Sequence, residues 1–393
     1  MPKVLRIINR FNLGGPTYNV AYLSKYIDGY ETLLVGGEKD ESEDSSTFIT
    51  SSLGLKPVII EEMKRKIDPV QDLAAFKKIK NIINDFKPDI VHTHASKAGT
   101  LGRLAAFSCK VPKVVHTFHG HVFHSYFGLA TTTFYKNIER YLARRSDAII
   151  AISDKQKVEL SEIHKICSPD KIKVIPLGFD LLKFNSNIES KRINFRNKYC
   201  LASDEICIGI IGRLVPVKNH NLFIQAFCNL TKKSNKKVKA FIIGDGELRD
   251  NLFALCQSLG LSYSYVDQPD YTAQVIFTSW IQEVDQILAG IDIVALTSFN
   301  EGTPVSLIEA QACNKPIVTT NVGGIENVVK TNKTALLCEN NNLESFTNAL
   351  VKMVDDDELR LKMGTDGWAF VKDNFHYTRL CSDMKALYDN LLK

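Results

Sequence analysis

The stretch ICIGIIGRLVPVKNHNLFIQAF, residues 206–227, contains the pattern that decides the predicted fold. Its first part, ICIGII, is apolar on both faces, as is typical of a strand inside a parallel sheet. A short loop follows, and the rest of the stretch has apolar residues at helical spacing. Similar strands and helices alternate up to about residue 339. This alternation predicts βαβ units in a doubly wound sheet.

The same alternation of buried strands and helices occupies residues 4–177. Between the two halves, residues 178–192 are polar and have no clear period, so we place a domain boundary there. The fold class is therefore predicted to be α/β, with two facing Rossmann-like domains and an interdomain cleft that binds a ligand at the carboxyl ends of the strands. The predicted domains are residues 1–184 and 185–372, followed by a C-terminal helix within 373–393.

The composition is that of a globular protein large enough for two hydrophobic cores. The 393 residues are 45% hydrophobic and 24% charged, and a net charge of +5 is too small to argue for nucleic acid. The nine cysteines include no CxxC pair and lie mostly in apolar runs, which favours a reduced, cytoplasmic protein. The N-terminus leads into a strand without a signal-peptide pattern, and no apolar run reaches about 18 residues. We therefore expect a protein that neither uses a signal peptide nor spans a membrane.

The segment FNEGTPVSLIEAQACNKPIVTTNVGG, residues 299–324, offers the strongest chemical pattern. Pro304 suits the first turn of a helix, so the loop before it presents free backbone N–H groups at a positive helix end. Such a helix start binds anions, and Gly302 would let its backbone approach a phosphate or sugar closely. Glu301 could bind the hydroxyls of a donor sugar, and Glu309, about two turns into the helix, those of a ribose. The alternative is a plain strand–loop–helix with two surface glutamates.

Two cations follow the strand that opens the second half of the chain. Gly212 ends this strand, and Arg213 and Lys218 flank the loop before the next helix. Arg can grip two oxygens at once and Lys acts as a point charge, so the pair suits a diphosphate. Each close contact could contribute on the order of 4 kcal/mol of Coulomb energy at an effective dielectric near 20, before desolvation. The alternative is a pair of solvated surface charges.

The E-x7-E spacing of Glu301 and Glu309, with the following VTTNVGGIENVV, resembles the signature of retaining glycosyltransferases of family 4, which have the GT-B fold. The pattern G-R-L-x-x-x-K-N is similar to that family as well, and the resemblance covers most of the chain. It implies that Arg213 and Lys218 hold the donor's diphosphate. It also implies that the C-terminal domain binds the nucleotide sugar, that the N-terminal domain faces the acceptor, and that the last helix crosses back to the N-terminal domain.

Two loops of the first domain also resemble loops of that family. The pair Gly14 and Gly15 matches the loop that contacts the donor phosphates and the acceptor, although a bare tight turn is equally compatible with it. It is not GxGxxG and gives no support for a nicotinamide cofactor. The H-G step of TFHG assigns the role of the family's catalytic-cleft histidine to His119, while His116 is expected to be buried. A metal cluster of the histidines in residues 116–124 is the alternative, but no cysteine or carboxylate completes one.

The resemblance implies two sets of site residues and no metal ligands. The aspartates of the DxD at residues 355–357 lie far from every phosphate motif, and we attribute them to helix-terminal charge. The implied catalytic residues are His119, Arg213, Lys218 and Glu301. The implied substrate- and nucleotide-binding residues are Gly14, Gly15, Gly212, Gly244, Trp280, Ile281, Gly302, Thr303, Pro304, Val305 and Glu309.

The function implied by the resemblance is transfer of a sugar from a nucleotide diphosphate-sugar, with UDP-sugars favoured, to an acceptor hydroxyl with retention of configuration. No metal or other cofactor is expected. The acceptor would be a lipid-linked or surface-polysaccharide glycan, with peripheral contact at the inner membrane face. Three alternatives stay open, because a fold alone does not fix a function: a nucleotide-sugar epimerase, a phosphorylase, and a non-catalytic sugar-nucleotide-binding subunit.

Two segments lack a recognisable pattern. The acidic, Ser/Thr-rich residues 38–52 are expected to form an exposed, mobile loop. Residues 262–274 match the family poorly and are expected to form an inserted loop.

Overall fold

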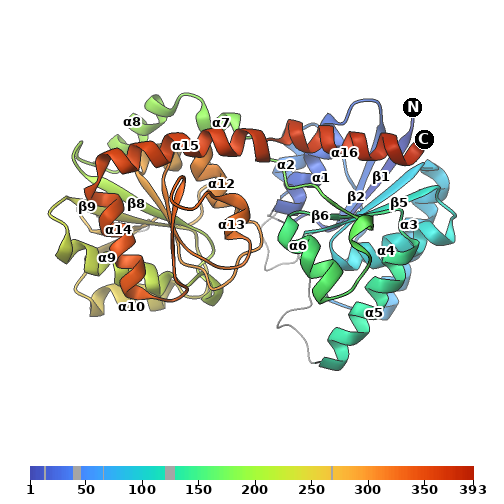
Figure 1. The fold of residues 1–393 in the computed structure, drawn as a ribbon, viewed down its shortest axis with the longest axis horizontal. Helices are drawn as coiled ribbons and strands as arrows, with labels where there is room; N and C mark the ends of the chain where they lie inside the picture. Colours follow the sequence, from blue (N-terminus) through green and yellow to red (C-terminus); the bar gives the residue numbers. More distant parts are fainter. Residues whose placement is uncertain (13–14, 39–45, 65, 120–128, 267–268) are drawn as a thin grey trace. The chain divides into compact units, whose positions relative to one another are not determined.

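The computed structural model consists of two compact α/β units (Figure 1). Unit 1 comprises Met1–Phe179 together with Asn374–Lys393, and unit 2 comprises Asp180–Asp373. Each unit has a seven-stranded sheet whose strands are all parallel among the residues described. The structure describes residues 1–12, 15–38, 46–64, 66–119, 129–266 and 269–393.

The sheet of unit 1 has the strand order β3-β2-β1-β4-β5-β6-β7. The chain starts at β1, builds outward to β3, and then returns to the other side of β1, so β1 and β4 flank the point where the winding direction reverses. Open parallel sheets bind ligands at the carboxyl ends of the strands beside such a point. The strands are β1 (Lys3–Arg10), β2 (Glu31–Gly37), β3 (Val58–Ile59), β4 (Ile90–His94), β5 (Lys113–Phe118), β6 (Ala148–Ala151) and β7 (Ile172–Val174).

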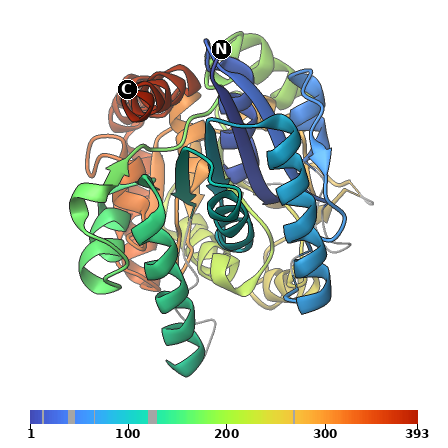
Figure 2. The same cartoon turned by 90° about the vertical axis from the view of Figure 1, so that its right-hand side faces the viewer.

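Helices cover both faces of this sheet (Figure 2). On one face, Leu23 of α1 and Met384 of α16 pack with Val4 and Ile90 of the sheet. On the other face, α3 and α4 pack through small and branched residues such as Ile79. The last helix of the chain is therefore part of the core of unit 1. The helices are α1 (Gly15–Tyr26), α2 (Thr47–Ser52), α3 (Pro69–Phe86), α4 (Ser96–Ser108), α5 (Leu129–Arg145), α6 (Asp154–Val158) and α16 (Tyr377–Leu392), with short helical turns at Glu159–Ile163 and Pro169–Lys171.

Unit 2 has a similar sheet with the order β10-β11-β9-β8-β12-β13-β14, in which β11 lies between β9 and the edge strand β10, and its reversal point lies between β8 and β12. The strands are β8 (Ile206–Ile211), β9 (Val238–Ile243), β10 (Tyr263–Tyr265), β11 (Val275–Phe277), β12 (Ile293–Leu296), β13 (Ile317–Thr320) and β14 (Ala335–Cys338). The helices are α7 (Leu182–Asn185), α8 (Ile188–Lys198), α9 (His220–Lys233), α10 (Arg249–Ser258), α11 (Val284–Gly290), α12 (Val305–Ala312), α13 (Ile325–Val328), α14 (Leu343–Asp355) and α15 (Asp357–Phe375), with a 3₁₀ turn at Pro216–Lys218.

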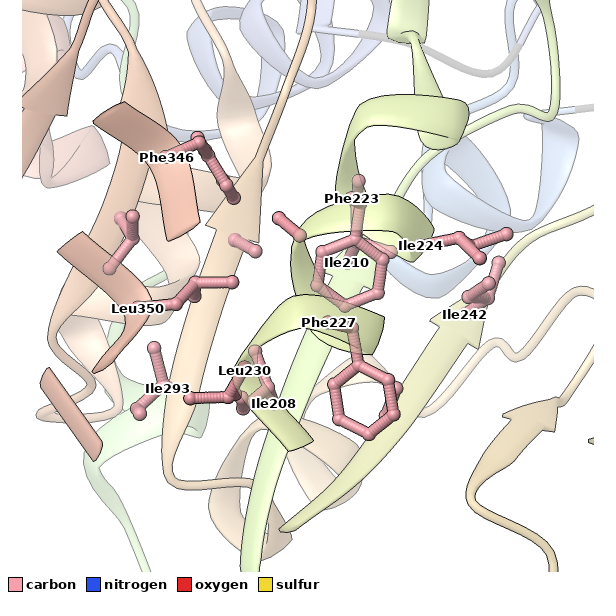
Figure 3. Packing of buried hydrophobic residues seen from close by; sticks show 14 of the residues in the cluster. Ile208, Ile210, Phe223, Ile224, Phe227, Leu230, Ile242, Ile293, Phe346 and Leu350 are labelled. Carbon is pink, nitrogen blue, oxygen red and sulfur yellow. The ribbon is translucent and has the colours of Figure 1, made fainter. Parts of the chain in front are cut away.

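The core of unit 2 shows why residues 206–227 decide the fold (Figure 3). Ile208 and Ile210 of β8 point to the same face, where Phe223 and Phe227 of α9 cover them. Phe346 of α14 belongs to the same cluster. Each side chain is at most 1% exposed, and burying one of this size contributes about 1.5–3 kcal/mol. The alternating strand positions and the helical spacing thus build a single apolar layer.

The two segments without a recognisable pattern, residues 38–52 and 262–274, both contain regular structure. The prediction that they form loops was therefore wrong in part. Residues 262–274 begin with β10, an edge strand that pairs with β11. Within residues 38–52, Thr47–Ser52 forms α2 with Ile49 and Thr50 buried, whereas residues 39–45 lie outside the described ranges. Both elements are too short to show a period in the sequence.

The polar segment at the predicted boundary leads into a helix. The contact boundary falls between Phe179 and Asp180, and α8 begins at Ile188. This helix lacks an apolar stripe. Its Phe195 is buried, with the ring centroid 5.2 Å from that of Phe241, and the guanidinium groups of Arg192 and Arg196 lie 2.7 Å and 3.4 Å from the carboxylate of Asp292. Charge pairing with a distant residue leaves no periodic pattern, so the sequence did not indicate this helix.

All nine cysteines are unpaired and six of them are buried, in agreement with their expected use as small core residues. None of the helices within the described ranges has the length and apolar character needed to cross a bilayer.

Candidate active site

Two loops meet at the reversal point of unit 2. One follows β8 and contains Gly212–Lys218, and the other follows β12 and contains Ser298–Pro304. The Phe299 backbone N–H donates to the Val217 carbonyl at 2.8 Å, and the Thr297 hydroxyl donates to the Lys218 carbonyl at 3.0 Å. Because β8 and β12 are parallel neighbours, their carboxyl ends present both loops on one edge of the sheet.

Lys218 and Glu301 form an ion pair at this edge. Lys218 Nζ lies 2.5 Å from Glu301 Oε1, and the Ser298 hydroxyl donates to the same oxygen at 2.6 Å. The methylene chain of Lys218 passes over Gly212, where a Cβ would lie 3.5 Å from Lys218 Cε. An ammonium carries three N–H donors, so Lys218 can keep Glu301 and still bind a phosphate oxygen. Both hydrogen bonds go to Oε1, so neither of them occupies Oε2.

Arg213 lies in the same loop after β8 as Lys218 and is exposed. Within the described part of the chain, its guanidinium makes no hydrogen bond or ion pair. An exposed guanidinium at the carboxyl end of β8 is available to an anion, which it can bind with two parallel hydrogen bonds.

The start of α12 provides the third positive group. Pro304 is its N-cap residue, and no side chain caps the first N–H groups. Gly302 is exposed, and a Cβ there would meet nothing within 4 Å. A Cβ at Gly324, by contrast, would lie 1.9 Å from the Gly302 carbonyl oxygen. The Gly324 N–H donates to the Glu301 carbonyl at 2.8 Å, so the family-like NVGG segment fixes the backbone of the loop before α12.

The predicted nucleotide residues near β9 and β11 have two different environments. Gly244 has φ +134°, its N–H donates to the Ser279 carbonyl at 3.0 Å, and a Cβ would lie 2.0 Å from the Gly212 carbonyl. This close backbone approach requires a glycine, whereas its contact with a nucleotide stays a prediction. Trp280 is 45% exposed and lines, with Ile281, a pocket of about 250 Å³ at the carboxyl ends of β10 and β11.

Glu309 lies on the first turns of α12 and is half-buried. Desolvation raises the pKa of its carboxyl to about 7, with nearby Lys183 opposing the rise and Asp285 adding to it. Thr303 and Val305, the other loop residues implied by the resemblance, flank the N-cap on either side and are also half-buried. The ribose role of Glu309 stays a prediction.

The raised pKa makes Glu309 a testable source of pH-dependent stability. The unfolded chain loses this proton near pH 4.5 and the folded chain near pH 7, so the group lowers stability progressively as the pH rises through that window. We expect Glu309→Gln to raise the free energy of unfolding at pH 8 by about 2–3 kcal/mol, and the melting temperature with it. At pH 5 the gain in unfolding free energy should be much smaller. Thermal unfolding at both pH values measures this, and an equal gain at both would contradict it.

In unit 1, the predicted histidine lies beside a second one. His119 follows β5, His94 ends the neighbouring strand β4, and His94 Nδ1 lies 2.9 Å from His119 Nε2. His116 is buried, as expected, and its Nδ1 is 2.8 Å from the Thr93 hydroxyl. Among the residues that the structure describes, no group of three His, Cys, Asp or Glu side chains could hold a metal ion.

Several sequence predictions in unit 1 fall on residues that the structure does not describe. Gly14, His121 and His124 are among these, whereas Gly15 is the first residue of α1. In unit 2, two aspartates of the DxD contact nearby polar residues. The Ser234 hydroxyl donates to Asp355 at 2.6 Å, and Lys236 Nζ lies 2.5 Å from Asp357 Oδ1.

Four buried polar residues of unit 1 belong to no motif that the sequence indicated: Arg6, His92, His94 and Tyr388. The run DIVHTH gave one indication that His92 and His94 have polar partners, because buried polar residues in an otherwise apolar parallel strand need them.

Comparison with known proteins matches both units. A family model described as Glycosyl transferases group 1 matches residues 191–368, and one described as Glycosyltransferase Family 4 matches residues 28–182. The UDP-Gal:alpha-D-GlcNAc-diphosphoundecaprenol alpha-1,3-galactosyltransferase of Escherichia coli is 30% identical over 355 residues, which cover 90% of this chain and 88% of that protein. The capsular polysaccharide biosynthesis glycosyltransferase CapM of Staphylococcus aureus is 26% identical and covers 84% of each chain.

Solved structures share the fold. Anabaena Alr3699/HepE in complex with UDP has a TM-score of 0.81 at 18% sequence identity, with 99% of this chain and 100% of that chain covered. A glycosyltransferase from Rickettsia africae has a TM-score of 0.79 at 20% identity, with coverage of 100% and 99%. Together with the two parallel sheets, these structures confirm the predicted pair of Rossmann-like domains.

Proposed function

Since this chain belongs to the glycosyltransferases of family 4 and has their GT-B fold, we propose that it moves a hexose from a UDP-sugar to a hydroxyl of a lipid-linked glycan, with retention of configuration. The observation that carries the proposal is the convergence of Lys218, Glu301 and the uncapped start of α12 at the end of β8, where Arg213 also stands.

Two known proteins support the choice of donor and acceptor. The name of the Escherichia coli relative gives UDP-Gal as its donor and a diphosphoundecaprenol-linked GlcNAc as its acceptor. HepE, which shares the fold, has been crystallised with UDP and with UDP-glucose. We extend this chemistry to the present chain: a UDP-hexose as donor and a sugar hydroxyl of a polyprenyl diphosphate-linked glycan as acceptor.

The charges at the site suit the leaving group of this reaction. As the bond from the anomeric carbon to the β-phosphate oxygen breaks, its electron pair stays on that oxygen and negative charge grows on the diphosphate. Lys218, Arg213 and the N–H groups at the start of α12 are positive groups already in place, so they stabilise this charge without reorganising. Glu301 would bind hydroxyls of the sugar through the oxygen that Lys218 and Ser298 leave unbonded.

Retention follows if the acceptor attacks from the face that the diphosphate leaves. The acceptor oxygen then forms the new bond to the anomeric carbon, and its proton goes to the departing phosphate oxygen. This step balances without a protein nucleophile. We propose that the cations named above neutralise the diphosphate, so the reaction proceeds without a divalent metal ion.

Transfer assays with the purified full-length protein test the proposal. We expect one of UDP-galactose, UDP-glucose and UDP-N-acetylglucosamine to yield a disaccharide on undecaprenyl diphosphate-linked GlcNAc, with an α linkage in the product's NMR spectrum and no loss of rate in EDTA. A β linkage would contradict retention, and loss of rate in EDTA would contradict metal independence. Interconversion of the donor sugar without acceptor would instead identify an epimerase.

A further inference from the structure

A network of hydrogen bonds centred on Asp245 joins three strand ends of unit 2. Asp245 lies after β9, and its carboxylate can only accept hydrogen bonds. Oδ2 accepts from the Ser279 hydroxyl after β11 at 3.2 Å, from the Tyr265 hydroxyl of β10 at 3.3 Å and from Arg249 Nη1 at 3.2 Å. Oδ1 accepts from the Gly246 N–H at 2.7 Å. The direction of every bond to this carboxylate is therefore fixed.

The backbone conformation of Ser279 needs support from such bonds. Its φ of +56° lies in the left-handed region, where the Cβ of a serine crowds the following carbonyl oxygen and a glycine would not. Two donors hold the Ser279 carbonyl: the Gly244 N–H at 3.0 Å and the Thr278 hydroxyl at 3.0 Å. The bond to Asp245 holds the Ser279 side chain. These three bonds offset the cost of the left-handed conformation.

The turn at Ser279 also sets the direction of the next backbone N–H. No peptide bond among the described residues is cis, so the C=O and N–H of one peptide unit point in opposite directions. Because the Ser279 carbonyl points toward the Gly244 N–H, the N–H of Trp280 points away from Gly244. Within the described ranges this N–H has no hydrogen-bond partner, and Trp280 lines the pocket of about 250 Å³ together with Tyr265. The turn thus determines where a free backbone donor beside this pocket points.

The side chain and the backbone of Asp245 contact different loops. Its carbonyl accepts from the Leu214 N–H at 3.0 Å, and Leu214 follows Arg213 in the loop after β8. Its carboxylate, by contrast, bonds to Ser279 in the loop after β11. A substitution at Asp245 removes the carboxylate and keeps the carbonyl. It therefore acts on the loop after β11 and leaves the bond to the proposed diphosphate loop in place.

We propose that Asp245 is a positioning residue for nucleotide binding: it holds the left-handed turn at Ser279 and so fixes the direction of the Trp280 N–H toward the base of the nucleotide. The carbonyl oxygens of a uracil ring are acceptors for such a donor. The contact with the base rests on the proposed function, whereas the role of Asp245 in the turn does not.

Nucleotide affinity tests the proposal, with UDP and inorganic pyrophosphate as probes in calorimetric titrations of the full-length protein. Asp245→Ala should weaken UDP binding about tenfold, the factor that corresponds to the cost of a left-handed serine. The Kd of pyrophosphate, which lacks a base, should change by less than about twofold. Asp250→Ala is the matched control, because it removes a carboxylate 3.5 Å from Arg249 Nε that is 85% exposed. It should change neither Kd.

Substitutions of Ser279 in the Asp245→Ala background separate the turn from a general loss of structure. Asp245→Ala/Ser279→Gly should bind UDP within about threefold of the unsubstituted protein, because a glycine adopts positive φ without the Cβ penalty. Asp245→Ala/Ser279→Ala should bind UDP as weakly as Asp245→Ala, because an alanine keeps the Cβ. Equal UDP affinities of the two double variants, or equal losses for UDP and pyrophosphate in Asp245→Ala, would overturn the proposal. If Asp245→Ala fails to fold, the single variants decide: Ser279→Ala should weaken UDP binding and Ser279→Gly should not.

Tryptophan fluorescence measures the turn without any ligand. The chain has two tryptophans, so Trp368→Phe leaves the signal of Trp280 alone. In that background, Asp245→Ala should lower the steady-state anisotropy of Trp280, because the released turn lets the side chain move more freely. Addition of Ser279→Gly should restore the anisotropy. An anisotropy that Asp245→Ala leaves unchanged would contradict the role of Asp245 in the turn, even if the protein binds no UDP.

The two proposals fail in distinguishable ways. The predicted anisotropies and UDP affinities without transfer from any UDP-sugar would contradict the proposed function and leave the positioning role intact. Sugar transfer by a protein whose anisotropy and UDP affinity do not respond to Asp245→Ala would do the reverse.

Discussion

Arg213→Ala should lower kcat by about 10²–10³-fold, the loss typical of removing one preorganised donor to a developing negative charge. The side chain is exposed and has no hydrogen-bond or ion-pair partner within the described residues, so its removal breaks nothing in the folded protein. Substitutions of that kind usually change the unfolding free energy by no more than about 0.5 kcal/mol. We therefore expect a large kinetic effect with an almost unchanged melting temperature, measured by initial rates at saturating donor and by thermal unfolding.

Two further variants sharpen this test. Arg213→Lys keeps the charge but loses the paired hydrogen bonds, and should fall between the alanine variant and the unsubstituted protein. Lys232→Ala removes one exposed charge at the other end of α9, at the amino edge of the sheet, and should leave kcat unchanged. If Arg213→Ala keeps its kcat within twofold, the leaving-group site has been assigned to the wrong residues.

Glu139→Leu should destabilise unit 1 more than any other single change we propose. Arg103 of α4 is 0% exposed, its Nη2 lies 2.6 Å from Glu139 Oε2 of α5, and its Nε donates to the Gly99 carbonyl at 2.7 Å. Replacing the carboxylate with an apolar side chain of similar size leaves the guanidinium charged and unpaired in the core. Breaking a buried pair in this way costs about 3–5 kcal/mol. Chemical unfolding measures this loss directly.

The double variant Arg103→Met/Glu139→Leu separates charge from packing. Removing both partners takes the unpaired charge away, so most of the lost stability should return. Asp204→Asn breaks an exposed pair with Lys237 and should barely move the melting temperature. A double variant as unstable as Glu139→Leu would show that packing, and not the buried charge, accounts for the loss.

Local pattern was sufficient for most of the fold. The run at 206–211 predicted β8 because both faces of a central parallel strand are buried, and Ile208 and Ile210 are at most 1% exposed. The glycine and proline positions around Gly302 predicted the loop before α12 for an equally local reason. Elements stabilised by contacts with distant residues have no such local pattern in the sequence. The edge strand β10 has one paired neighbour, and α8 contacts the rest of unit 2 through Phe195 and through ion pairs with Asp292.

The candidate site shows the same contrast between residues that a local pattern predicted and contacts that depend on the tertiary structure. The residue pattern and the family resemblance assigned Lys218 and Glu301, in two separate loops, to the same predicted donor site. Their 2.5 Å contact exists because β8 and β12 are neighbours across the reversal point of the sheet. No local pattern indicated the contact of His94 with His119, because that contact exists only where β4 lies next to β5.

The sequence by itself determined where most strands and helices and the glycine-containing loops after β8 and β12 occur, because burial period, glycine conformation and helix-start chemistry act over a few neighbouring residues. Only the tertiary structure decided which of these loops share an edge and which buried polar groups become partners. Arg6 and Tyr388 are 382 positions apart, and their hydrogen bond forms because strand order and helix packing bring the two ends of the chain into one core.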